Sequence, residues 1–152
     1  MRIIQSTEEL KQLAGQEVAA GEWIEVTQEM INRFADVTGD HQWIHVDAGR
    51  AARESPFGKT IAHGFLTLSL LSEMSRQAME WRGDYKLRIN YGMNRLRFPA
   101  PVPSGSKIRA RFTLQSVEEF DWGVQTVWAA TVEIEGGSKP AMVAEWVTRA
   151  YR

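Results

Sequence analysis

The chain has 152 residues, of which 43% are hydrophobic and 24% are charged, a composition typical of one soluble globular domain. Its 18 basic and 19 acidic residues give a formal net charge of −1, which argues against a globally basic nucleic-acid-binding protein. The absence of cysteine excludes a disulfide scaffold, a thiolate zinc site and a cysteine nucleophile.

The amino-terminal segment does not have the pattern of a targeting sequence. Its first ten residues include Ser6, Glu8 and Glu9 and lack the apolar run of a signal peptide. No apolar run in the chain reaches the roughly 18 residues that a membrane-spanning helix needs. We therefore expect a cytoplasmic protein with no membrane partner.

The first elements of the chain are predicted from capping signals. Ser6 followed by Glu9 is a capping-box pattern, which predicts a short helix that stops at Gly15. Residues 21–26 contain Trp23 and several β-branched or aliphatic residues, and this composition favours a short strand.

Two further helices are expected before residue 54. Thr27 is a suitable N-cap for an amphipathic helix that ends by Gly39. Residues 40–47 are expected to form a loop, and Asp47 then caps a short helix that runs through Arg53.

The segment 62–81 is the longest helical candidate. Its first half is apolar on nearly all sides, which is typical of a buried helix. At about 1.5 Å per residue it would be about 30 Å long, enough to cross a small domain.

After Gly83 the apolar period changes from helical to two. We expect four long antiparallel strands, with a bulge in the first strand at Gly92, where the apolar parity shifts. The last strand, residues 140–151, is apolar on both parities, as a covered central strand would be. The pattern predicts an α+β fold in which an antiparallel sheet wraps around a long central helix.

Acid–base chemistry is suggested by one short stretch. The chain has three histidines, His41, His45 and His63, and Asp40 lies five residues before His45. A carboxylate and an imidazole in one cavity form a proton donor and acceptor. The structural alternative is an Asp that caps a turn and a His that is satisfied in the core. His41 and His45 lie four residues apart, but the loop context and the lack of a third ligand argue against a metal site.

Gly64 is a second candidate, because Ala62-His63-Gly64 opens the long helix. The first N–H groups of a helix have no intrahelical partner, and glycine leaves them open to a ligand oxygen. This gives a candidate oxyanion hole. The alternative is that Gly64 only permits close packing of the helix against the sheet.

Basic residues are concentrated between residues 85 and 117, where there is no Asp or Glu. This segment can meet a polyanion such as a nucleotide phosphate, or it can form ordinary solvated strand faces. Its basic residues are Lys86, Arg88, Arg95, Arg97, Lys107, Arg109 and Arg111.

Taken together, these stretches resemble the MaoC-like dehydratases, hotdog-fold proteins that include the (R)-specific enoyl-CoA hydratases. The resemblance rests on Gly39-Asp40-His41-Gln42-Trp43-Ile44-His45-Val46-Asp47, on Ile61-Ala62-His63-Gly64, and on Ser72 eight residues after Gly64. The strand from Asn90 to Val102 also looks like the family's segment after the helix. The resemblance covers roughly residues 27–147.

The resemblance implies a single hotdog domain over residues 1–152 and a catalytic pair, Asp40 and His45. It also implies that the Gly64 N–H is the oxyanion donor and that Ser72 supports the pair. Gln42 and Trp43 replace the family's Asn-Pro. Gln42 keeps an amide that can hydrogen-bond, whereas the larger Trp43 puts the acyl chain-length preference in question.

The implied reaction is the reversible hydration of trans-2-enoyl-CoA to (R)-3-hydroxyacyl-CoA in fatty-acid metabolism. The CoA thioester is the substrate, and neither a metal nor a prosthetic cofactor is needed. The implied assembly is a homodimer with edge-to-edge sheets and no nucleic-acid partner. The alternatives are a hotdog acyl-CoA thioesterase, a non-catalytic acyl-CoA or acyl-carrier binding module, and a nucleic-acid module that would leave the Asp–His loop unexplained.

Overall fold

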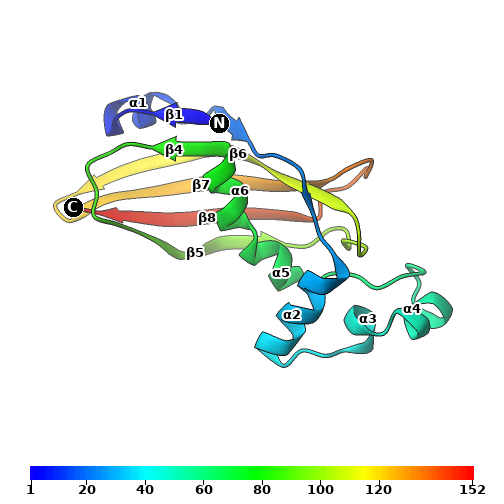
Figure 1. Cartoon of the computed structure of the whole chain (residues 1–152). Coiled ribbons are helices and arrows are strands. Elements are labelled where there is room, and N and C mark those ends of the chain that lie inside the picture. The colour runs from blue at the N-terminus through cyan, green and yellow to red at the C-terminus, as the bar shows by residue number, and fades with distance from the viewer.

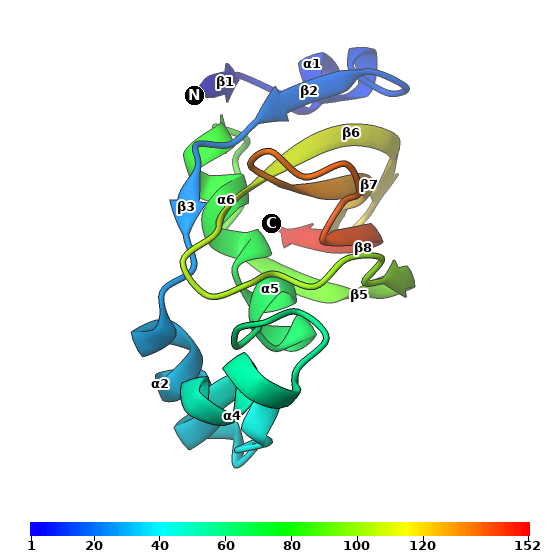
Figure 2. The same cartoon turned by 90° about the vertical axis from the view of Figure 1, so that its right-hand side faces the viewer.

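A curved antiparallel sheet dominates the computed structural model, which describes residues 1–152. The strands follow the order β2-β6-β7-β8-β5, and β3 also pairs with β6. Figures 1 and 2 show helices α5 and α6 lying against one face of this sheet. The strands are β2 (Glu17–Ala20), β3 (Ile24–Glu25), β5 (Leu87–Arg97), β6 (Lys107–Phe120), β7 (Gly123–Ile134) and β8 (Met142–Tyr151). The predicted α+β hotdog architecture is confirmed.

The period-two pattern of the sequence correctly predicts the four long strands. Strand β8 lies between β7 and β5 in the sheet, which explains its apolar residues on both parities. The pairing of β5 with β8 slips between Asn90 and Gly92, so the bulge predicted near Gly92 is present.

The prediction of one continuous helix over 62–81 is wrong. The segment forms α5 (Gly64–Ser69) and α6 (Leu71–Ala78), and the chain then extends as strand β4 (Met79–Trp81). The Ser69 hydroxyl donates to the Phe65 carbonyl at 2.7 Å, a contact that bends helices and coincides here with the break at Leu70.

The amino-terminal residues contribute a pairing that local patterns did not predict. Strand β1 (Arg2–Ile4) pairs in parallel with β4, as Figure 1 shows. Helix α1 (Thr7–Gln12) follows, and Ser6 caps it by accepting from the Glu9 N–H at 3.1 Å.

Helices α2 (Gln28–Thr38), α3 (Trp43–Val46) and α4 (Ala48–Glu54) form a separate group beyond one end of the sheet (Figure 1). Thr27 and Asp47 cap α2 and α4 as predicted. Residues 40–47 are not simply a loop, because they contain the one-turn helix α3, which is too short to show a period.

The core lies between the sheet and helices α5 and α6. Phe112 on β6 is fully buried, and its ring centroid lies 6.5 Å from that of Trp128 and 6.4 Å from that of Trp146. This aromatic layer fixes the distance between the sheet and α6 and therefore the position of the helix that begins at Gly64. None of the helices is long and apolar enough to cross a membrane.

Candidate active site

The candidate site lies where the α2–α3 connection meets the chain that leads into α5. Gly39 ends α2 in the left-handed conformation, with a φ of 76°, and its N–H donates to the Ala35 carbonyl. Glycine adopts this conformation at little cost, so the chain can turn sharply at this point. The turn places Asp40, the next residue, at the exposed edge of the site.

His45 is buried, and one hydrogen bond fixes its tautomer. Its Nδ1 lies 2.7 Å from the carbonyl oxygen of Ile61. A carbonyl can only accept, so Nδ1 carries the proton and Nε2 of the neutral ring keeps a lone pair. The ring is therefore oriented to accept a proton at Nε2.

His63 was not predicted to be a site residue, yet it contacts both members of the pair. Its ring stacks on His45 with centroids 3.8 Å apart and an interplanar angle of 24°. Its Nε2 donates to the backbone carbonyl of Asp40 at 3.0 Å, which ties the Asp40 loop to the start of α5. Its Nδ1 is buried and has no partner. In the sequence, the only indication that His63 lies in the site was its position directly before Gly64 in the Ala62-His63-Gly64 pattern.

Gln28 is a second supporting residue that the sequence did not reveal. From the first turn of α2, its Nε2 donates to the His45 carbonyl at 2.7 Å, and its Oε1 accepts from the Thr60 hydroxyl at 2.5 Å. One side chain thus links α2, α3 and the segment before α5. A single glutamine in a helix has no distinctive pattern, so no local signal indicated this role.

The environment of His45 favours its neutral form. Burial is the largest influence and lowers the pKa of His45, and the nearby His63 lowers it further. The hydrogen bond to the Ile61 carbonyl and the charge of Asp40 act in the opposite direction without cancelling this effect. At neutral pH the ring is therefore a base rather than an acid.

The three residues also form a cluster of metal-ligand type. Ligand atoms of Asp40, His45 and His63 all lie within 4.8 Å of one another. One nitrogen of each histidine donates to a carbonyl, which leaves the other nitrogen as its lone-pair donor. The stacked rings direct their remaining lone pairs along nearly parallel planes, and this geometry does not favour convergence on one ion. The cluster fits acid–base chemistry better than metal binding.

Gly64 opens α5 directly after His63, as predicted. Its N–H makes no hydrogen bond within the chain, which leaves it available to a ligand oxygen. A Cβ at this position would lie 3.1 Å from the ring of Phe98, so the glycine also permits a close approach. Both features that the sequence left open, a free donor and tight packing, are present here.

Gln42 lies beside the pair but is exposed. Its N–H is 3.4 Å from an Asp40 carboxylate oxygen, and its carbonyl accepts from the His45 N–H at 3.0 Å. Trp43 lies under the guanidinium of Arg50, at 4.3 Å from the ring centroid. His41 pairs with Asp36 at 2.9 Å and is separate from the cluster.

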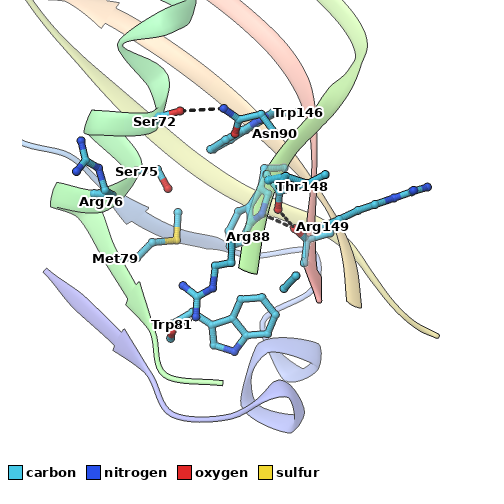
Figure 3. A pocket seen from close by; sticks show the side chains of 14 residues that line it. Ser72, Ser75, Arg76, Met79, Trp81, Arg88, Asn90, Trp146, Thr148 and Arg149 are labelled. Carbon is cyan, nitrogen blue, oxygen red and sulfur yellow. Dashed lines mark hydrogen bonds between the residues drawn. The ribbon is translucent and has the colours of Figure 1, made fainter. Parts of the chain in front are cut away.

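Ser72 does not hydrogen-bond to Asp40 or His45. Its hydroxyl lies on α6 and accepts from Asn90 Nδ2 on β5 at 3.2 Å, the upper dashed line in Figure 3. Both residues line a cavity of about 400 Å³ between α6 and the sheet. Ser72 therefore belongs to the wall of this cavity.

The basic segment does not form one free cationic surface. Arg109 pairs with Glu133 at 2.8 Å, and Arg111 pairs with Glu17 at 2.6 Å. These β6 side chains are largely neutralised by acidic residues from neighbouring strands, which local sequence could not show.

Comparisons with known proteins agree with this geometry. The profile described as the MaoC-like domain matches residues 9–136. Over 150 residues the chain is 53% identical to 3-hydroxyacyl-thioester dehydratase Z of Mycobacterium tuberculosis, covering 98% of each protein. It is 47% identical over 146 residues to nodulation protein N of Rhizobium meliloti, covering 95% of this chain and 91% of that protein. The unliganded R-hydratase PhaJ1 from Pseudomonas aeruginosa has a TM-score of 0.71 and 26% identity, covering 91% of this chain and 82% of that one.

The contrasting surroundings of two histidines can be tested by NMR titration of the imidazole rings. Burial lowers the pKa of His45, so its midpoint should lie below the ordinary value of 6.5. The hydrogen bond to Asp36 raises the pKa of exposed His41, so its midpoint should lie above 6.5 and serves as the internal control. A His45 midpoint at or above that of His41 would contradict the buried, neutral ring.

Proposed function

The chain belongs to the MaoC-like domain family, and we propose that it hydrates trans-2-enoyl-CoA reversibly to (R)-3-hydroxyacyl-CoA. Membership of this family supports an enzyme of the hydratase/dehydratase type. The observation that carries the proposed chemistry is the neutral His45, which is held by the Ile61 carbonyl with its Nε2 free beside Asp40.

The proposed reaction starts with polarisation of the substrate. The thioester carbonyl accepts a hydrogen bond from the Gly64 N–H, which has no partner within the chain. This donor stabilises the enolate-like charge that develops on the oxygen as a nucleophile adds at C3. His63 immediately precedes Gly64 and stacks on His45, so it links the segment that carries the donor to the ring that acts as the base.

Proton transfer is assigned to His45, with Asp40 as its partner. A water molecule donates one hydrogen bond to the Asp40 carboxylate and the other to His45 Nε2. His45 takes the proton as the water oxygen bonds to C3, and the electron pair of the double bond moves towards C2. The imidazolium then returns the proton to C2, so atoms and charge balance and the enzyme regains its starting form.

These steps use no metal and no prosthetic group. The Gly64 N–H polarises the thioester, the Asp40 carboxylate holds the water, and the His45 imidazole transfers the proton. The names of the relatives, a 3-hydroxyacyl-thioester dehydratase and an R-hydratase, support the substrate type and the (R) configuration. We further propose that the enzyme acts in cytoplasmic fatty-acid metabolism, as the family resemblance of the sequence implies.

A homodimer is proposed from the exposed sheet edge. Strand β5 pairs with β8 on one side only, and its other edge is open. Leu87 and Tyr91 on this strand are 53% and 55% exposed. Long, apolar edge strands are normally covered, and pairing with a second copy would cover this one. The molecular mass in solution, measured by light scattering, tests this assembly.

The proposed activity and its residues can be tested together with crotonyl-CoA. Loss of the enoyl-thioester absorbance, with an (R) product by chiral analysis, is expected for the wild type. Asp40→Asn and His45→Gln should each lower the rate by about 100- to 10,000-fold, the usual contribution of a positioned acid–base group. His41→Gln is the matched control, because His41 pairs with Asp36 outside the cluster.

Release of free CoA thiol in place of hydration would identify a thioesterase. Binding of acyl-CoA without turnover would identify a binding module. Undiminished hydration by a folded Asp40→Asn or His45→Gln variant would remove that residue from the mechanism.

Gly64→Ala tests the oxyanion donor. Alanine favours a helix by up to about 1 kcal/mol over glycine, so the fold should persist if Phe98 moves by a few tenths of an ångström. The methyl group would fill the space beside the donor N–H, and loss of one oxyanion contact lowers rates by about 100- to 1,000-fold. Hydration should fall to this extent while the far-ultraviolet circular dichroism spectrum stays unchanged.

The double variant Gly64→Ala/Phe98→Ala separates the two roles of the glycine. It removes the crowded ring but keeps the added methyl group. Hydration should stay low if the substrate needs the open donor. Recovery of full activity would show that Gly64 serves only the packing of Phe98.

A further inference from the structure

Helices α5 and α6 turn one face towards β5 and the chain that follows it. Four half-buried residues recur on this face every three or four positions, Gly64, Leu68, Ser72 and Ser75, and Met79 follows them on β4. Phe98 packs against Gly64, and Asn90 hydrogen-bonds to Ser72. The same helical face thus carries Gly64, at the proposed thioester site, and Ser72 and Ser75, which line the cavity in Figure 3.

Near Gly64 this helical face meets Phe98. Most of the cavity wall beyond Ser72 is apolar, and Met79, Trp128 and Trp146 contribute to it. Beyond Ser72 the 400 Å³ cavity has hydroxyl, amide and guanidinium groups but no Asp or Glu in its lining. Its polar lining residues are Ser72, Ser75, Arg76, Arg88, Asn90, Thr126, Thr148 and Arg149, of which Arg149 directs its side chain away from the cavity in Figure 3.

Arg88 lies on the helix-facing side of β5. It stands opposite Ala150 in the β5–β8 ladder, and Ala150 is 2% exposed, so Arg88 points towards the covered face. Figure 3 shows its side chain running along the cavity towards Trp81. The guanidinium lies 4.8 Å from the Trp81 ring centroid and donates to the Trp81 carbonyl.

No carboxylate of the chain pairs with Arg88, which leaves most of its five N–H donors free. The other two arginines at the cavity are already engaged. Arg76 pairs with Glu73, and Arg149 donates to Gln125 at 2.9 Å. Partial burial lowers the pKa of Arg88, although the residue keeps an exposed surface. Glu80, whose charge acts on Arg88, already pairs with Arg82 at 3.0 Å.

Resting on the proposed function, we infer that the cavity holds the far end of the acyl chain and that this end carries a carboxylate. A methyl terminus would cover Arg88 and Asn90 without replacing the hydrogen bonds they lose to water. A carboxylate supplies two acceptor oxygens in the planar arrangement that suits a guanidinium. The cavity's cationic lining, without acidic residues, is complementary to this charge.

The dimensions fit an acyl chain of intermediate length. Gly64 and Ser72 are eight residues apart along nearly continuous helices, about 12 Å at 1.5 Å per residue. An extended chain advances about 1.2 Å per bond, so roughly ten bonds separate the thioester from the mouth of the cavity. Twelve-carbon acyl groups should therefore place their terminus beside Arg88.

The test compares two substrates that differ only at the terminus: dodec-2-enoyl-CoA and the mono-CoA thioester of dodec-2-enedioic acid. For the wild type, kcat/KM for the carboxylate-ended substrate should exceed that for the methyl-ended one by at least about tenfold, as a hydrogen bond to a charged group allows. Arg88→Gln should lower this ratio by at least about tenfold.

Arg95→Gln is the matched control, because Arg95 is on the same strand but stands opposite Glu145 and is not in the cavity lining. Its ratio should equal that of the wild type. Ser75→Asp offers a second variant should Arg88→Gln fold poorly, since an internal carboxylate in the cavity should also abolish the preference.

A wild-type ratio near one, or a ratio unchanged by both Arg88→Gln and Ser75→Asp, would overturn the assignment of a carboxylate terminus while crotonyl-CoA is still hydrated. No hydration of crotonyl-CoA or of either twelve-carbon substrate would overturn the proposed function itself, and with it this inference.

Discussion

The hydrogen bond from His45 Nδ1 to the Ile61 carbonyl is the contact on which the site depends. It joins the one-turn helix α3 to the segment that enters α5, beside the backbone hydrogen bond from the Ile61 N–H to the Ile44 carbonyl. It also leaves Nε2 unprotonated, so the same bond defines both the position and the chemical role of the ring. Burial then keeps the ring neutral by lowering its pKa.

Two side chains, the buried His63 and the half-buried Gln28, support this arrangement. His63 stacks on the His45 ring and holds the Asp40 backbone, while Gln28 holds the His45 backbone from α2. Neither has to touch a substrate to matter, because a proton acceptor displaced by 1 Å loses much of its effect. The aromatic layer around Phe112 extends this rigidity to the sheet, since it supports the helices that carry Gly64.

The sequence allowed prediction of features whose signals are local. Capping at Thr27 and Asp47, the bulge near Gly92 and the pairing of Asp40 with His45 in one short stretch follow from neighbouring residues. The resemblance to a family added the hotdog architecture, which the structure confirms, and the oxyanion role of Gly64, which stays a prediction.

Features that depend on distant contacts could not be predicted in this way. The pairing of β1 with β4 joins residues more than 70 positions apart, and the bridge through Gln28 spans 17 and 32 positions. Ser72 was expected to contact the catalytic pair, but its hydroxyl accepts a hydrogen bond from Asn90 on β5. The pairing register of β5 with β8 could not be predicted from the sequence. That register also brings Arg88 to the cavity.

The stereochemical course of hydration in D₂O tests the central claim most directly. If His45 Nε2 takes a deuteron from water and returns it to C2, both groups reach the substrate from the side on which Asp40 and His45 lie. NMR of the product from crotonyl-CoA should then show hydroxyl and deuterium added to the same face of the double bond. Addition to opposite faces would contradict a single base that both accepts and returns the proton.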